Sequence, residues 1–214
     1  MSRRSADERR EQLIDAAIRV MIRDGVAKAT TRAVVAEAGL PLGAFHYCFR
    51  AKEQLLHSVI ERIMLRALDA PDGPDGPDGP DGPVFGDAPV GEVVRGTLGA
   101  YWERVRRNPD EHLLTYELTQ YALRKPGLAD VARGQYRHYT EVSLRQLETI
   151  ARRSGAEWTL PLPVLARYGL SALDGLTLNW LIDRDDEAAS AALDLYANHL
   201  VTLLRPVTEP AAVV

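Results

Sequence analysis

Apolar residues recur at three- and four-residue spacings along most of the chain, which is the spacing of one face of an α-helix. Within residues 8–23, one such stripe is formed by Leu13, Ile14, Ala17, Ile18 and Met21. Similar patterns predict helices over residues 31–38, 42–49, 52–67, 91–107, 110–124, 128–153, 164–182 and 185–204. No alternating run of the kind that predicts a β-strand stands out. The pattern therefore predicts an all-α protein of about nine helices.

Glycine, proline and threonine mark the ends of these segments. Gly25 is placed to end the first helix, because glycine adopts the backbone conformation found at helix C-termini. Thr30 or Thr31 can cap the second helix through its side-chain oxygen. Gly39 then interrupts the pattern, so a short turn is expected before the third helix.

A repeat interrupts the helical pattern at residues 71–83, which read PDGPDGPDGPDGP. Glycine at every third position is found in collagen, but about four triplets flanked by helical sequence are too few for a triple helix. Pro-Asp-Gly favours turns, and the aspartates repel one another. We expect a flexible linker. Two interpretations stay open, a repeat tolerated at the surface and a segment with a role of its own.

Charge is distributed unevenly along the chain. The formal net charge is −4, made up of +3 in residues 1–70 and −7 in the remainder. A mildly basic N-terminal part on an acidic body is typical of a nucleic-acid-binding module joined to a second domain. Cys48 is the only cysteine, so an intramolecular disulfide or a multi-cysteine zinc site is excluded. We expect no metal and no cofactor.

The motifs of common enzymes are not found. The sequence has no phosphate-binding loop, no dinucleotide-binding glycine pattern, no H-E-x-x-H and no G-x-S-x-G. A helical di-iron enzyme would need Glu-x-x-His, whereas His138 and Glu141 stand in the reverse order. The first ten residues are rich in charge and lack the apolar stretch of a secretory signal, and no run is long enough to span a membrane. We expect a cytoplasmic protein that is not an enzyme and has no membrane partner.

Residues 31–49 have the pattern of a helix-turn-helix, with two short helices separated by a turn that contains glycine. The second helix of such a pair can enter the major groove of DNA. A small core that fixes the crossing angle is expected from Val34, Val35, Ala38, Leu40 and Phe45. The small residues Gly43 and Ala44 let the second helix approach DNA closely.

The segment at residues 27–56, AKATTRAVVAEAGLPLGAFHYCFRAKEQLL, resembles the DNA-binding signature of the TetR family of transcriptional regulators. Positions that agree with the family pattern are Thr31, Ala38, Gly39, Gly43, Phe49, Lys52, Glu53 and Leu55, and Val35, Leu40 and Phe45 are apolar substitutes. The resemblance implies an N-terminal three-helix DNA-binding domain over residues 1–52. A helical effector-binding and dimerisation domain would follow over residues 53–214.

Three positions depart from that pattern. Pro41 replaces a common serine at the start of the recognition helix, and Cys48 stands where the family often has histidine or tyrosine. His46 replaces a tyrosine that contacts a phosphate, and a histidine can still donate a hydrogen bond there.

The resemblance also assigns candidate DNA contacts. Thr31, Arg32 and Lys52 are candidates for phosphate contacts, which set affinity without reading sequence. The candidates for the groove-facing surface are Leu42, Gly43, Ala44, His46 and Tyr47, of which Leu42 and Ala44 can contact thymine methyl groups. Alternatives stay open: Tyr47 as a packed or solvent-facing aromatic, Arg32 as a surface charge, and Lys52 with Glu53 as a helix-start pair.

An effector site is expected among the middle helices. Aromatic and polar side chains that suit such a site are Trp102, Tyr116, Gln120, Tyr121, Tyr139, Asn179 and Trp180, although each also suits the core or an interface. They favour a moderately apolar or aromatic small molecule of unknown identity. In the family, the last two helices, here about 164–182 and 185–204, form a four-helix bundle with those of a second copy.

Taken together, the resemblance implies a homodimeric, ligand-responsive regulator that binds a palindromic double-stranded DNA operator. The first interpretation is a repressor that its ligand releases from the operator, because the ligand favours a conformation that does not fit the DNA. An activator or a protein-binding adaptor on the same fold, and a helical-bundle enzyme, are the alternatives.

Overall fold

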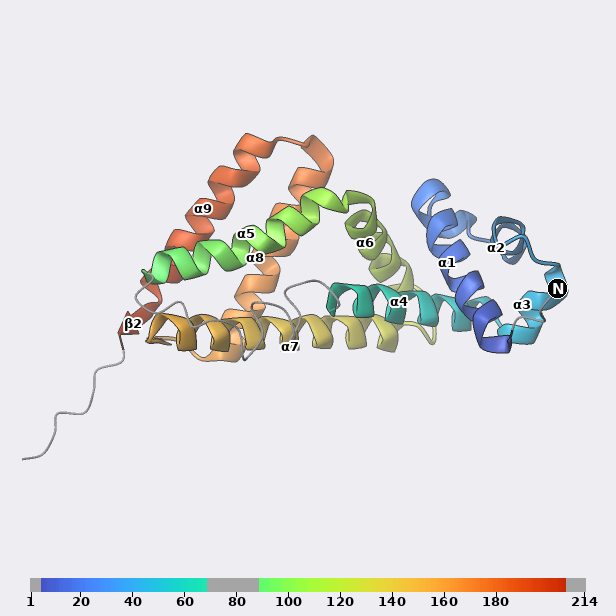
Figure 1. The fold of residues 1–214 in the computed structure, drawn as a ribbon, viewed down its shortest axis with the longest axis horizontal. Helices are drawn as coiled ribbons and strands as arrows, with labels where there is room; N and C mark the ends of the chain where they lie inside the picture. The colour runs from blue at the N-terminus through green and yellow to red at the C-terminus, as the bar shows by residue number, and fades with distance from the viewer. Residues whose placement is uncertain (1–4, 69–88, 207–214) are drawn as a thin grey trace, which may run out of the picture. The chain divides into compact units, whose positions relative to one another are not determined.

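The computed structural model describes residues 5–68 and 89–206, and these ranges are almost entirely helical (Figure 1). The elements are α1 (Ala6–Asp24), the 3-10 turn η1 (Val26–Lys28), α2 (Thr31–Glu37), α3 (Leu42–Cys48), α4 (Lys52–Leu68), α5 (Val90–Arg107), α6 (Pro109–Leu123), α7 (Ala129–Ser154), β1 (Ala156–Trp158), α8 (Leu162–Asp183), α9 (Asp186–Thr202) and β2 (Leu204–Pro206). The all-α prediction is confirmed, and every predicted helix begins and ends within two residues of its expected bounds. The predicted linker at residues 71–83 lies outside the described residues.

The chain divides into two compact units. The first comprises residues 5–68 and 110–136, and contains α1 to α4, α6 and the first turns of α7. One apolar cluster fills it, with buried side chains from each of these helices, among them Leu13, Val34, Phe45, Leu55 and Leu118. This division reflects which segments pack together. The predicted boundary after residue 52 separates a DNA-binding function from an effector-binding function, and it stays a prediction.

The ends of α1 are fixed by local hydrogen bonds. At the start, the Ser5 hydroxyl accepts from the Glu8 amide at 3.1 Å, and the Glu8 carboxylate accepts from the Ser5 amide at 2.8 Å. Such reciprocal capping satisfies two backbone donors that the helix itself leaves free. At the other end, Gly25 has a φ of +87°, which ends the helix where it was predicted to end.

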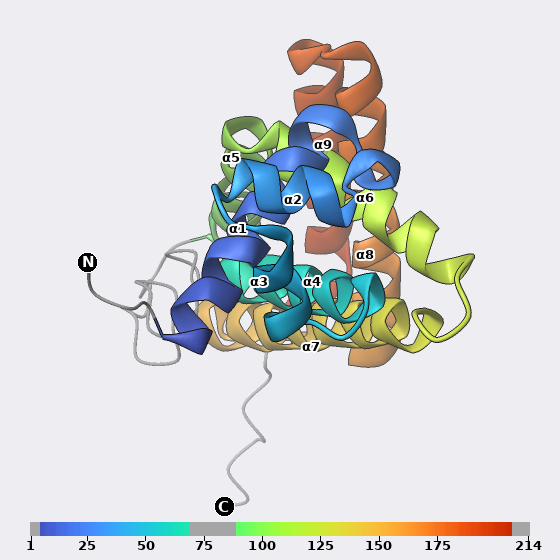
Figure 2. The same ribbon diagram turned by 90° about the vertical axis from the view of Figure 1, so that its right-hand side faces the viewer.

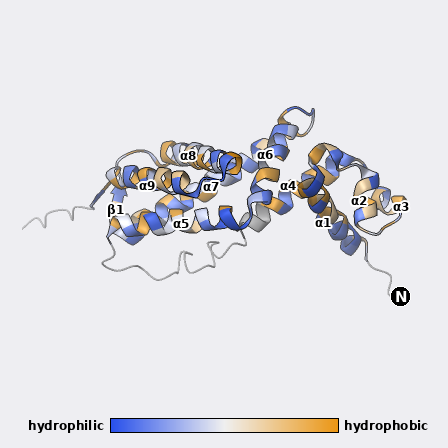
Figure 3. Ribbon diagram, turned by 90° about the horizontal axis from the view of Figure 1, so that it is seen from above, coloured by the Kyte–Doolittle hydropathy of each residue, from blue (hydrophilic) through white to orange (hydrophobic). Residues whose placement is uncertain are grey.

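The second unit comprises residues 89–109 and 137–206. It contains α5, the remainder of α7, α8, α9 and the two short strands. Buried residues of α5 and α9 pack together, including Val94, Leu98, Tyr196 and Leu200. Figure 3 shows α8 and α9 lying side by side in this unit, as their contacts also indicate.

Two three-residue strands were not predicted. β1 and β2 pair in antiparallel register, with Glu157 opposite Arg205, and the two side chains form an ion pair of 2.9 Å. Strands this short carry no readable alternation, and their pairing joins segments far apart in sequence. The helices of the described ranges include none that is both long and apolar enough to cross a membrane.

Candidate functional site

Helices α2 and α3 and the turn between them form the predicted helix-turn-helix (Figure 2). The Thr30 hydroxyl accepts from the Ala33 amide at 3.2 Å, so Thr30 is the residue that caps α2. Gly39 follows with a φ of +63°, a conformation that favours glycine. Pro41 then precedes α3 without a side-chain cap, as the replacement of serine implied.

The predicted core beneath the two helices is confirmed. Val34, Val35, Ala38 and Phe45 are buried, and Leu40 is half-buried against the same cluster. The Phe45 and Phe49 rings lie 5.6 Å apart between their centroids, so the recognition helix is attached by two aromatic side chains. The crossing of α2 and α3 is thereby set by packing rather than by the turn alone.

Arg10 on α1 joins three parts of this module. Its guanidinium donates to the Cys48 carbonyl at 3.1 Å, at the end of α3, and to the Ser58 hydroxyl at 2.7 Å, on α4. It also lies over the Phe49 ring, 4.4 Å from the centroid. A planar guanidinium can make all three contacts at once, which a lysine ammonium cannot. Sequence reasoning missed Arg10, because its partners are distant in the chain.

Exposed ion pairs join α1 to α2. Arg19 and Arg23 each lie 2.9 Å from the Glu37 carboxylate. Hydrogen bonds from Arg23 and then Arg19 hold the pKa of Glu37 below its ordinary value. All three groups are solvent-accessible, so these pairs add little stability each, but they help to orient α2.

The outward face of α3 is apolar and exposed. Leu42 is 43 % exposed and Tyr47 is 69 % exposed, and Gly43 and His46 are exposed beside them. Ala44 is half-buried and so lies at the margin of this face. Tyr47 is part of α3, and a side chain this exposed makes no contribution to the core beneath that helix. The packed-aromatic alternative for Tyr47 therefore does not hold in this unit.

The remaining candidate DNA contacts flank this face. Arg32 is exposed and Thr31 half-buried at the start of α2. Lys52 begins α4 and is half-buried, with its ammonium 5.9 Å from the centroid of the Tyr121 ring. Cys48 is not on the exposed face: its sulfur lies 3.9 Å from the Ala6 carbonyl, and burial raises the pKa of the thiol.

The predicted effector residues fall into both units. In the second unit, the buried Trp102 and Trp180 pack edge to face with centroids 5.6 Å apart. The Trp180 indole donates to the Asp186 carboxylate at 2.8 Å. Asn179, singled out because it interrupts an apolar run, is exposed on α8. The preceding Leu178 is exposed as well, so this part of α8 faces solvent, which accounts for the interruption.

Three of the predicted effector-binding residues belong to the first unit. Tyr116 and Tyr121 are half-buried on α6, and Gln120 is exposed between them. The Tyr121 ring lies beneath the ammonium groups of both Lys52 and Lys125. On this evidence Tyr121 is a cation-binding ring, and its assignment to an effector stays a prediction.

The second unit also holds polar groups that sequence reasoning missed. The Tyr101 hydroxyl, on α5, lies 2.8 Å from the Thr177 hydroxyl on α8. Burial raises the pKa of Tyr101 to about 12, the hydrogen bond to Thr177 opposes that shift, and the charge of Asp174 adds to it. Tyr139 is close enough to contribute as well. Within the described residues, His138 Nε2 on α7 is buried without a hydrogen-bond partner.

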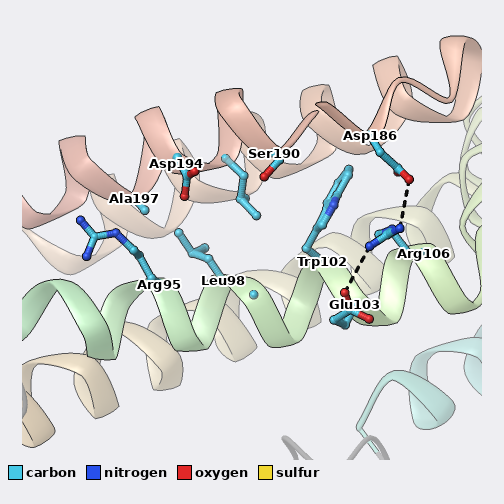
Figure 4. A pocket seen from close by; sticks show the side chains of 11 residues that line it. Arg95, Leu98, Trp102, Glu103, Arg106, Asp186, Ser190, Asp194 and Ala197 are labelled. Atoms are coloured by element: carbon cyan, nitrogen blue, oxygen red, sulfur yellow. Dashed lines mark hydrogen bonds and ion pairs between the residues drawn. The ribbon is translucent and has the colours of Figure 1, made fainter. Parts of the chain in front are cut away.

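A hollow of about 440 Å³ lies along α5 and α9 (Figure 4). Leu98 and Trp102 line it from α5, and Asp194 lines it from α9. At one end, Arg106 forms an ion pair of 3.0 Å with Asp186. Of the residues predicted to bind an effector, Trp102 is part of this wall.

Comparison with known proteins decides the family. Residues 13–59 match the model of the tetR family of bacterial regulatory proteins, and residues 91–205 match the C-terminal domain of BetI-type transcriptional repressors. The chain belongs to the TetR family. It is a ligand-responsive, DNA-binding transcriptional repressor, as the sequence signature predicted.

Individual relatives agree with this assignment. The nicotine-responsive repressor HdnoR of Paenarthrobacter nicotinovorans is 29% identical over 182 residues, which is 85% of this chain and 88% of that protein. The multidrug-binding protein EbrR in complex with ethidium is 27% identical, with a TM-score of 0.63 over 92% of this chain and 99% of EbrR. The imidazole complex of EbrR gives 28% identity and a TM-score of 0.59, covering 94% of this chain and 93% of EbrR.

Proposed function

We propose that this TetR-family repressor acts as a homodimer formed through α8 and α9. Large apolar side chains are exposed on both helices: Val164, Leu178 and Ile182 on α8, and Leu195 on α9, with exposures of 56, 43, 75 and 72 %. A soluble monomer seldom exposes so much apolar surface on two adjacent helices, and a symmetric second copy would cover it.

Other large or apolar residues of the same two helices are buried within the chain itself and are not free to contact a second copy, among them Leu165, Trp180, Ala189, Tyr196 and Leu200. The pattern locates the apolar faces of a helix and does not say which of them pack internally. Sedimentation equilibrium tests the proposal, since a dimer is expected and a monomer at micromolar concentration would contradict it.

The operator proposal rests on the exposed face of α3. One short helix with few polar side chains provides little affinity, so two copies are needed on a site with two-fold symmetry. Leu42, Gly43, Ala44, His46 and Tyr47 would face the major groove, and Thr31, Arg32 and Lys52 would contact phosphates. Since the partner is chromosomal DNA, we place the protein in the cytoplasm. Footprinting should protect two half-sites with centres about 34 Å, or a multiple of that, apart, and one protected block would contradict the symmetry.

For the effector, we propose a site in the second unit around Tyr101, Tyr139 and His138. Tyr139 acts electrostatically on Tyr101, and its ring lies 6.3 Å from that of His138 between centroids. Small-molecule sites generally combine aromatic rings with a few polar groups. A buried nitrogen without a protein partner is costly, and a ligand group can satisfy it. The names of the relatives point to ligands that contain nitrogen: nicotine for HdnoR, and ethidium and imidazole for EbrR. We therefore propose an aromatic or apolar nitrogen compound as the effector class.

Tryptophan fluorescence tests the effector proposal, because Trp102 and Trp180 lie in the same unit. A panel of pyridine amines, ethidium, imidazole and choline is titrated into the wild type, Tyr139→Phe and His138→Ala. Arg137→Ala, an exposed site on α7 next to His138, is the matched control. A compound that binds the repressor and releases it from operator DNA should bind at least tenfold more weakly to the His138 variant. Equal losses in the Arg137 variant would place the site elsewhere.

A further inference from the structure

Two lysine ammonium groups in the first unit lie over the ring of the same tyrosine. Lys52 Nζ, at the start of α4, lies 5.9 Å from the centroid of the Tyr121 ring, and Lys125 Nζ lies 5.4 Å from it. Both distances are within the range of a cation–π contact. Lys125 belongs to the turn between α6 and α7, which Figure 2 shows next to the start of α4. Residues 73 positions apart in sequence are thereby brought to one point.

Neither of the two lysines forms an ion pair within the described residues. The neighbouring Arg124 is exposed and also lacks an ion pair in residues 5–68 and 89–206. Burial lowers the pKa of Lys52, the charge of Glu53 opposes this, and the charge of Lys125 lowers it further. The two ammonium groups therefore repel each other, although the charge of Glu53 affects the pKa of Lys52 more than the charge of Lys125 does.

An anion held between the two ammonium groups would relieve this repulsion. The nearest functional surface is the exposed face of α3, which ends at Cys48, four residues before Lys52. With α3 in the major groove of DNA, the phosphates of one adjoining strand would lie near the start of α4. The length of the lysine side chain and the exposure of the turn give Lys125 access to the same strand.

We propose that Lys52 and Lys125 together form a phosphate-binding site for the DNA backbone, with Tyr121 as the ring that positions both ammonium groups. The turn between α6 and α7 is then part of the DNA interface. This inference rests on the proposed operator binding, and it makes α6 a direct participant in affinity. An effector-induced displacement of α6 would separate the lysines and weaken binding without any change in α3.

The test is the salt dependence of operator binding by Lys125→Ala and Arg124→Ala, two variants with the same net charge on the same turn. Each phosphate contact contributes about 0.9 to the slope of log K against log salt. Lys125→Ala should lower the slope by about 1, and should weaken binding to operator and scrambled DNA by the same factor. Arg124→Ala, which lacks the ring contact, should change the slope by less than half as much. Equal effects would overturn the site, because the general charge of the turn would then explain them.

Two further measurements separate a binding role from a structural one. Lys52→Ala and Lys125→Ala should be non-additive in a double-mutant cycle, since one phosphate is shared. Tyr121→Leu, which removes the ring, should lower the salt slope as Lys125→Ala does, and Tyr121→Phe, which keeps the ring, should recover most of that loss. Additive lysine effects would contradict the proposal. If the wild type itself binds no operator, operator binding has failed, whereas a wild type that binds with an unchanged slope in Lys125→Ala refutes the two-lysine site alone.

Discussion

Removal of the Arg10 guanidinium should loosen the recognition helix. In Arg10→Ala, the Cys48 carbonyl and the buried Ser58 hydroxyl lose their donor, and the Phe49 ring loses the cation above it. Hydrogen bonds from a charged group contribute about 1.5–3 kcal/mol each, and the half-buried position of Arg10 argues for the lower end. The ring contact adds about 0.5–1 kcal/mol. We expect the free energy of unfolding to fall by about 3.5–4 kcal/mol.

Urea unfolding and operator titration measure the two consequences. Arg10→Lys is the control, because it keeps the charge but cannot make both hydrogen bonds and the ring contact. We expect Arg10→Lys to retain the salt dependence of DNA binding while recovering less than half of the lost stability. Operator affinity should fall at least tenfold in Arg10→Ala, and binding to scrambled DNA should fall less. A stability within about 0.5 kcal/mol of the wild type, the ordinary range for surface substitutions, would refute the role given to Arg10.

Three further substitutions test other parts of the account. Gly39→Ala should cost about 1 kcal/mol in thermal unfolding, because a φ of +63° disfavours a side chain while the space around it is open; an unchanged melting temperature would contradict this. Leu195→Glu should convert the dimer into a monomer by sedimentation and abolish tight operator binding; a dimer that persists would move the interface away from α9. Glu37 is held ionised by Arg23 and Arg19, so its contribution to stability is present at neutral pH and lost as the pH falls below 4.5 through its lowered folded-state pKa. Glu37→Gln should remove that acid dependence, and an identical pH profile in the two proteins would count against the ion pairs.

The helices could be predicted because their signals are local. The apolar stripe of α1 and the glycines at 25 and 39 lie within the segments that they organise. The exposed face of α3 followed from the family pattern and from the small residues along it. These features need no knowledge of what packs against them.

The contacts that complete the candidate site join segments that are distant in sequence, so no local pattern predicts them. Arg10 meets residues on α3 and α4, and Lys125 meets the same ring as Lys52. Asn179 was misleading for a related reason, since an interrupted apolar run on α8 reflects a helix face turned to solvent. Which apolar face of a helix packs internally is decided by tertiary structure.

Operator binding is the central claim, and DNA from immediately upstream of the gene tests it most directly. The purified protein is titrated into that duplex at three salt concentrations, with a scrambled duplex as competitor. We predict tight binding that survives the competitor, a steep loss of affinity with salt and two protein copies per site. Equal, weak binding to both duplexes, followed by a selection of genomic fragments that enriches no sequence, would contradict the assignment of α3 as a sequence-reading helix.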